Sequence, residues 1–351
     1  MFFSNKKLIG IDLGSSMIKA AEINFSGKKA ELVGFSMTPT PEGAMVGGEI
    51  QQPGLLSEVI QSLVADLHSK RKQAAIGLWG TSVVVKKISI PRIEEKLIAG
   101  QIRWEAEQYI PFDIEDVNID YKILKDLSVA PETMDILLVA AKKDAIYMCQ
   151  DTLQGAGLAP AVIDLSSFAL ANCVQRNHPE ISQMTVAVMD MGASVTNFMV
   201  LEKGEVIFYR DIPVGGLTYT SEIQKSMNVS YEEAESLKLG ASDSGANPDE
   251  LLTAIKYGHD MVSEEIQNSI EFFMNTTPGI QIQKILYSGG GSRTFKCISE
   301  ISAKTNLPME KINIFNYISS KAGSFTAEFL EEVDQVGAVA MGLALRKVGD
   351  T

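Results

Sequence analysis

Cysteine and histidine are scarce in this sequence, which has three of each among 351 residues. The cysteines lie far apart, at Cys149, Cys173 and Cys297. Because no CxxC pair or Cys/His cluster exists, the sequence argues against a disulfide framework and against a zinc site. The histidines are His68, His178 and His259. They belong to no nucleophile or metal-ligand motif, so we expect no histidine-based chemistry and place each at the surface or at a helix end.

Long hydrophobic runs and an excess of basic residues are also lacking. The best candidate for a membrane span, VGAVAMGLAL at 336–345, is far shorter than the roughly 18 apolar residues that a span needs. The 31 Lys and Arg residues are outnumbered by 44 Asp and Glu, which gives a net charge of -13. Such a surface repels nucleic-acid phosphates. We therefore expect a cytoplasmic protein without direct membrane insertion and without a nucleic-acid partner.

What the sequence does contain is a repeated turn. GIDLGSSMIKA at 10–20 reads as two strands joined by a tight turn, and MDMGASVTNF at 189–198 has the same plan. At a constant offset of 178 residues (190 − 12), the matched pairs are Asp12 with Asp190, Gly14 with Gly192, and Ser16 with Ser194. One Asp-x-Gly turn has purely conformational explanations. Two copies half a chain apart favour a duplicated fold with two facing phosphate loops.

The residues of these turns suit a phosphate ligand. Small residues let successive backbone N–H groups point at phosphate oxygens. The residues concerned are Gly14, Ser15, Ser16, Gly192, Ala193 and Ser194. Lys19, on the outgoing strand, can reach the same phosphates as a point charge. Asp12 and Asp190, facing each other across a cleft, would hold Mg²⁺ through its waters, because Mg²⁺ prefers one or two carboxylates plus substrate phosphate.

A third glycine-containing segment points to the rest of a nucleotide. IQKILYSGGGSRTF at 282–295 is an apolar strand that runs into Gly289, Gly290 and Gly291 and then into a helix. Glycine permits close approach of the backbone to a ligand, and adenosine is the natural candidate. A flexible turn before a helix is the alternative. No GxxxxGK[ST] motif is present and no GxGxxG follows a strand, so the P-loop and Rossmann folds are excluded.

Together these motifs resemble the actin/hexokinase/heat-shock ATPase superfamily. The segment Asp12-x-Gly14-Ser15-x-x-x-Lys19 resembles its first phosphate loop, Asp190-x-Gly192-x-x-Val195-Thr196 its second, and SGGGSRT its adenosine motif. VGAVAMGLAL resembles its connecting helix, in which small residues allow close packing. The resemblance implies an α/β, duplicated actin/hexokinase-type (ribonuclease H-like) two-lobe fold that binds ATP and Mg. It adds Thr196 to the phosphate site and Ser292 to the adenosine site.

Two further segments resemble the FtsA-like branch of that superfamily. IPVGGLTYTSEIQKSMNVSYEEAESLKLG at 212–240 resembles its Gly-Gly-x-x-x-Thr segment and the helix that follows. By that resemblance Glu235 and Lys238 contact ribose or adenine, whereas the alternative is a surface i,i+3 ion pair. Residues 82–157 read as an inserted β-α-β-β-α block, an FtsA-like α+β subdomain. We expect the first lobe over 1–81, 158–185 and 325–351, and the second over 186–324, with a helical part at about 217–265.

The string WEAEQYIPF…NIDY, which begins at Trp104, resembles the PilM family of type IV pilus assembly proteins. That resemblance implies an ATP-binding cytoplasmic adaptor, held at the inner membrane through its partners. The expected partner is the N-terminal cytoplasmic peptide of PilN, bound in a groove beside the inserted subdomain. Other cytoplasmic pilus components are further candidates, and self-association stays open. Whether Trp104, Tyr109, Ile110 and Phe112 line the groove or form core is not decided by the sequence.

We expect at most slow ATP hydrolysis. In actin-like ATPases a Gln or Glu at the start of the first connecting helix orients the attacking water. Asp164, in VIDLSSFAL, is expected at the corresponding place and is one methylene shorter than Glu. We therefore expect tight ATP binding with slow or negligible hydrolysis. An actin-like ATPase that forms filaments and a metabolic kinase of the same fold are the alternatives, although no separate substrate-binding insertion is found.

Overall fold

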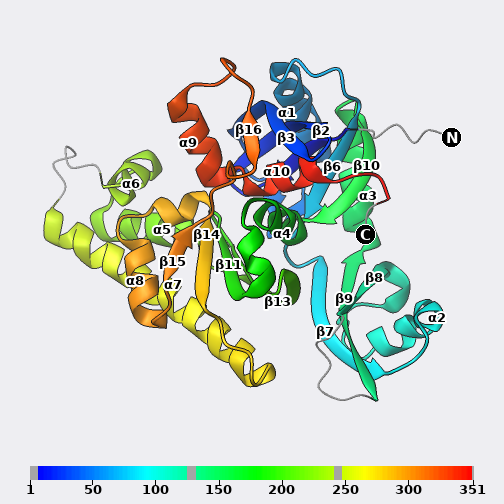
Figure 1. Cartoon of the computed structure of the whole chain (residues 1–351). Helices are drawn as coiled ribbons and strands as arrows, with labels where there is room; N and C mark the ends of the chain where they lie inside the picture. The colour runs from blue at the N-terminus through cyan, green and yellow to red at the C-terminus, as the bar shows by residue number, and fades with distance from the viewer. Residues whose placement is uncertain (1–6, 125–131, 241–246, 350–351) are drawn as a thin grey trace.

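Three principal β-sheets organise the chain (Figure 1), and the computed structural model describes residues 7–124, 132–240 and 247–349. The first sheet has the order β10 (Ala159–Leu165), β6 (Gln73–Leu78), β1 (Ile9–Leu13), β2 (Met17–Ser26), β3 (Lys29–Pro39), β16 (Ile318–Ser320). The second has the order β13 (Glu205–Ile212), β12 (Thr196–Glu202), β11 (Thr185–Met191), β14 (Lys284–Ser288), β15 (Met309–Lys311). The third has the order β7 (Val83–Pro91), β9 (Thr133–Lys142), β8 (Val117–Leu124), and β4 (Met45–Val46) and β5 (Glu49–Ile50) form a separate hairpin.

The two large sheets are copies of one plan. The order β3-β2-β1-β6-β10 in the first is repeated as β13-β12-β11-β14-β15 in the second. In each copy three antiparallel strands are followed by parallel ones. The register repeats as well, because Asp12 pairs with Lys19 and Asp190 pairs with Asn197, with the same offset of 178 (197 − 19). The expected duplicated two-lobe fold is therefore confirmed.

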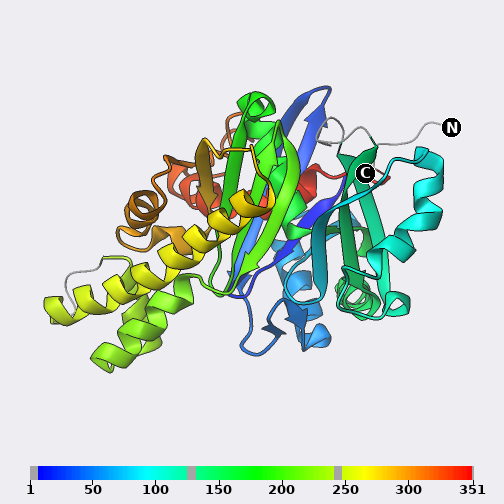
Figure 2. The ribbon, with the colours of Figure 1, turned by 90° about the horizontal axis from the view of Figure 1, so that it is seen from below.

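Helices cover both large sheets. In the first lobe these are α1 (Pro53–Asp66), α3 (Lys143–Gly155), α4 (Ser166–Asn177), α9 (Ala327–Val336) and α10 (Ala338–Leu345). In the second they are α5 (Gly216–Met227), α6 (Tyr231–Lys238), α7 (Pro248–Thr276) and α8 (Cys297–Thr305). Buried residues of α4 and α10 share one core with both large sheets, between which the two helices lie (Figure 1). The long helix α7 runs across the second sheet (Figure 2).

The small residues of α10 allow the close packing expected of them. A Cβ atom on Gly342 would lie 1.8 Å from the carbonyl oxygen of Ala169 in α4. A Cβ atom on Gly10 in β1 would lie 2.2 Å from the carbonyl oxygen of Ala340. Helix α10 thus contacts α4 and β1 backbone to backbone, and only glycine fits at these two positions.

The third sheet and α2 (Glu95–Ala106) form the inserted subdomain, which has its own apolar core. Ile110 is buried in that core, and Tyr109 and Phe112 pack partly buried against it. Trp104 is 74% exposed on α2. Of the four residues left undecided by the sequence, Tyr109, Ile110 and Phe112 therefore belong to this core, and Trp104 lies at the surface.

Observed packing differs from the expected domain boundaries in two places. Helix α3 was expected in the inserted subdomain, but Cys149 and Leu153 pack with Leu56 and Ile60 of α1 in the core of the first lobe. Strand β16 was expected in the second lobe, but it pairs with β3 of the first sheet. We therefore propose that the inserted subdomain spans 83–142. Residues 1–6 and 350–351 of the first expected lobe, 125–131 of the inserted subdomain and 241–246 of the second lobe lie outside the described residues.

The histidines depart in part from the expected surface or helix-end positions. His68 is exposed, and His178 lies at the C-terminal end of α4 but is buried. His259 lies within α7, buried, with its Nδ1 atom 3.1 Å from the Tyr219 hydroxyl. This expectation was wrong for His259 because its ring fits beside Tyr219, with an edge-to-face ring contact. Among the described residues, no helix is long and apolar enough to cross a membrane.

Candidate functional site

A cavity of about 280 Å³ opens between the two large sheets, at the turns that the repeat singled out. It brings together fourteen of the seventeen residues expected at the site. These are Asp12, Gly14, Ser15, Ser16, Lys19, Asp190, Gly192, Ala193, Ser194, Glu235, Lys238, Gly289, Gly290 and Gly291. Residues from both halves of the chain thus face one space, although their individual roles stay predictions.

The two turns have the same local geometry. The backbone N–H of Gly14 donates to the Met17 carbonyl at 3.1 Å, and that of Gly192 donates to the Val195 carbonyl at 2.9 Å. A Cβ atom on Gly14 would lie 2.7 Å from the Met17 oxygen, and one on Gly192 2.8 Å from the Val195 oxygen. Each turn therefore closes tightly on its own strand, and glycine is needed at its first position.

Two carboxylates and one lysine set the charge at the end of the cavity near the two turns. The Lys19 ammonium lies 2.9 Å from the Asp12 carboxylate; Asp12 is buried and Lys19 is half-buried. Burial raises the pKa of Asp190 to about 6; the charge of Asp12 adds to the rise, while Lys19 and a hydrogen bond from Ser288 oppose it. One lysine thus faces two carboxylates, so a cation between them would be favoured.

At the other end of the cavity, Glu235 and Lys238 come from α6. The Lys238 ammonium lies 2.5 Å from Glu235 and 3.0 Å from the Thr220 hydroxyl. Lys238 is only 5% exposed, so the alternative of a solvated surface ion pair is excluded. Gly291 lies against the second turn, where a Cβ atom would be 2.6 Å from the Gly192 oxygen. Gly289 and Gly291 are thus required by close backbone packing beside the cavity, whereas a Cβ atom on Gly290 would meet only the Val336 side chain, at 3.8 Å.

Three expected site residues do not line this cavity. The Thr196 hydroxyl donates to the Val214 carbonyl at 2.8 Å and is fully buried. The Ser292 hydroxyl donates to the Gly289 carbonyl at 2.6 Å, which stabilises the glycine turn. Asp164 pairs with Arg346, whose Nε lies 3.1 Å from Oδ2. Asp164 lies at the end of β10, two residues before α4 begins, and is held by the C-terminal segment.

The cavity is also lined by residues that were not predicted from the sequence. They are Met17, Met37, Trp79, Ser166, Val195, Asn197, Gly216, Leu217, Tyr231, Leu239, Arg293, Glu332, Val336 and Val339. Asn197 had a usable signal, since the 178-residue offset that matches Asp12 with Asp190 also matches Lys19 with Asn197. Ser166 had none beyond its place beside Asp164, because a helix start cannot be located to within a residue from sequence.

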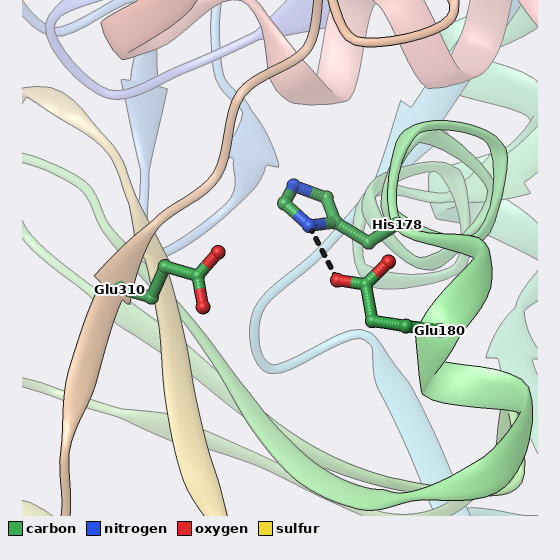
Figure 3. A group of neighbouring side chains, drawn as sticks. All are labelled: His178, Glu180 and Glu310. Carbon is green, nitrogen blue, oxygen red and sulfur yellow. Dashed lines mark hydrogen bonds and ion pairs between the residues drawn. The ribbon is translucent and has the colours of Figure 1, made fainter.

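A second group of potential metal ligands lies where the lobes meet, at His178, Glu180 and Glu310 (Figure 3). The Lys284 ammonium lies 2.7 Å from Glu310 and 3.8 Å from Glu180, so a cation is already present. The His178 Nε2 atom accepts from the Asn313 backbone N–H at 3.2 Å, which leaves the ring proton on Nδ1, beside Glu180 at 3.1 Å. Both ring nitrogens are thus engaged, and the group is explained as a structural junction.

The duplicated sheets and the cavity between their matched turns define an actin-like ATPase fold. EutJ of Carboxydothermus hydrogenoformans, 15% identical over 96% of this chain and 89% of its own, has this fold with a TM-score of 0.57. So does MreB5 of Spiroplasma citri, 12% identical over 97% and 95%, with a TM-score of 0.51.

Within that class, the family described as type IV pilus assembly protein PilM matches residues 10–348, and the chain belongs to this family. A structure of the PilM-PilN type IV pilus biogenesis complex is 27% identical over 99% of this chain and 100% of its own, with a TM-score of 0.87.

Proposed function

We propose that this chain is a Mg-ATP-binding adaptor of the type IV pilus assembly machinery. The observation that carries the proposal is the pair of matching turns that face one cavity together with Asp12, Lys19 and Asp190. Because both copies of the turn line the same cavity, a single ligand there can contact both of them. Nucleotide binding by a protein of this family is therefore the function that the geometry supports best.

Each part of the cavity has a part of the ligand that it fits. Backbone N–H groups of the two turns and the Lys19 ammonium would bind the phosphates. Asp12 and Asp190 would hold Mg²⁺, which screens the repulsion between carboxylate and phosphate. Glu235, Lys238 and the glycines at 289–291 would bind the adenosine end. Asp164 is paired with Arg346 and supplies no carboxylate to the cavity, so slow turnover is expected.

The second element of the proposal is the partner. The similar structure is a complex with PilN, and its sequence likeness extends over nearly the whole of both chains. We propose that this chain binds the N-terminal cytoplasmic peptide of PilN beside the inserted subdomain, which would place it at the inner membrane. Nucleotide would act by favouring one arrangement of the lobes, and thereby one shape of the peptide groove.

The test is a Mg-ATP titration of the purified protein, with phosphate release followed in the same sample. Asp12→Ala should lose most of the Mg-dependent affinity, while Asp151→Ala, an exposed aspartate on α3, should match the wild type. Binding with slow phosphate release would support the adaptor, and a synthetic PilN peptide would then be titrated with and without nucleotide. Fast turnover would contradict the adaptor, and no binding would refute nucleotide binding altogether.

A further inference from the structure

Helix α4 begins at the wall of the cavity, and its first residue lines the cavity. That residue is Ser166, which is 3% exposed and whose hydroxyl has no hydrogen-bond partner among the described residues. A buried hydroxyl without a partner is unfavourable, because its hydrogen bonds to water are lost on folding. Such a group needs an explanation, and a ligand in the cavity supplies one.

The backbone N–H groups at the start of α4 also lack hydrogen-bond partners from a capping side chain. The first N–H groups of a helix have no partner within the helix. Helix α4 has 12 residues, no side chain caps its N-terminus, and no acidic residue occurs in its first turn. Unsatisfied N–H groups and the helix dipole together favour an anion at this end.

Gly77 in β6 makes room for the Ser166 side chain. A Cβ atom on Gly77 would lie 2.4 Å from the Ser166 hydroxyl oxygen and 3.3 Å from the Ser166 Cα. Glycine at this position lets the hydroxyl lie against the sheet at the edge of the cavity. Ser166 is thus held by the packing of α4 on β6 and not by hydrogen bonds of its own.

We propose that the N-terminus of α4, with the Ser166 hydroxyl, binds the terminal phosphate of a nucleoside triphosphate. This inference rests on the proposed function and deepens it. The two turns would hold the phosphates common to ATP and ADP, and α4 would contact the one that only ATP has. Because a serine hydroxyl donates to an anion and is no base at neutral pH, this group retains the phosphate without activating water.

The experiment compares the affinities of Mg-ADP and of a non-hydrolysable Mg-ATP analogue for the full chain by calorimetry. Ser166→Ala should weaken the ATP analogue by about tenfold and ADP by less than about twofold, as expected for one lost hydrogen bond to a charged group. Ser167→Ala is the matched control, since Ser167 is buried and adjacent but does not line the cavity. Its ratio of ATP to ADP affinity should equal that of the wild type.

A thermal melt without nucleotide separates this role from a structural one. Since the hydroxyl has no partner in the protein, Ser166→Ala should melt no lower than the wild type. A second variant, Ser166→Asp, should weaken the ATP analogue further, by charge repulsion. Equal effects on both nucleotides, or none, would overturn the inference and leave the proposed function standing. A wild type that binds neither nucleotide would refute both.

Discussion

For Asp190, the sequence predicted the position in the fold but not the protonation state. The repeat predicted that Asp190 and Asp12 occupy equivalent positions, because each comes at the end of a strand, directly before a glycine turn. The pKa of Asp190 could not be predicted, since that depends on burial and on how close Asp12 and Lys19 come, which are properties of the folded cavity.

The raised pKa of Asp190 predicts pH-dependent nucleotide binding. In the folded protein this carboxyl holds its proton up to about pH 6, against 3.8 for the ordinary group. Between these values the native state binds the extra proton, so this group favours folding at the acid end and loses that contribution as the pH rises. Holding Mg²⁺ requires the carboxylate, so Mg-ATP affinity should rise with pH through about 6 and then level off.

Titrations of Mg-ATP from about pH 5 to about pH 8 would check this, with up to tenfold weaker binding per pH unit below the pKa. Asp190→Asn should bind more weakly and lose the dependence. A wild-type affinity that stays constant over the range would contradict the assignment of Asp190 to the metal.

Asp164 was expected to orient the attacking water, but in the structure its carboxylate contacts Arg346. Since Arg346 holds its carboxylate, Asp164→Glu should leave phosphate release unchanged. Asp164→Ala should lower the free energy of unfolding by about 1–3 kcal/mol, because it removes a largely buried ion pair. Urea unfolding would measure the loss, with Asp151→Ala as the surface control. A higher rate of phosphate release in Asp164→Glu would show that the carboxylate does reach the nucleotide.

At the scale of elements, the sequence was informative wherever a local pattern carries the information. Strand alternation, glycine turns and the repeat gave the two matched meanders, because turn conformation depends on a few adjacent residues. The location of α3 could not be predicted, because an amphipathic helix shows which face is buried but not which sheet it covers. Whether Asp164 or Ser166 lines the cavity depends on the residue at which α4 begins. Helix boundaries are the least predictable feature of a helix, so the sequence did not show which of the two it would be.

Among the contacts between elements, we expect the one between α10 and α4 to be the most sensitive to substitution. Gly342→Ala would place a Cβ atom 1.8 Å from the Ala169 carbonyl oxygen, so one helix must move. We expect a loss of about 1–3 kcal/mol in the free energy of unfolding, as for overpacked cores. Gly100→Ala, within α2, meets nothing within 4 Å and should be neutral or slightly stabilising. Urea denaturation of both variants checks this, and equal stabilities would mean that α10 shifts freely.

For the whole molecule, the lobes are joined on both sides of the cavity. On the α9 side, the Gln335 side-chain amide donates to the Gly289 carbonyl at 3.0 Å. On the other side, the Asp211 carboxylate of β13 accepts from the Gly80 backbone N–H at 3.1 Å. Gly80 lies between Trp79, which lines the cavity, and the inserted subdomain, which begins with β7. Asp211 therefore connects the second lobe to the chain segment that lies between the cavity and the inserted subdomain.

Asp211 also accepts from Asn197, a cavity residue, and from the Tyr209 hydroxyl. Asp211→Ala would leave these donors without their acceptor and release the Gly80 turn. We expect Mg-ATP affinity to fall several-fold, because binding would then have to close lobes that are no longer joined on the Gly80 side of the cavity.

The matched control is Glu205→Ala, which removes the exposed ion pair from β13 to Lys122 of the inserted subdomain. An ion pair so exposed contributes little, so this variant should bind Mg-ATP as the wild type does. Affinities measured by calorimetry, beside urea unfolding of both variants, separate a loss of closure from a loss of fold. If Asp211→Ala is folded and binds Mg-ATP as tightly as Glu205→Ala, closure does not depend on this contact, and the link from the nucleotide to the inserted subdomain must run elsewhere.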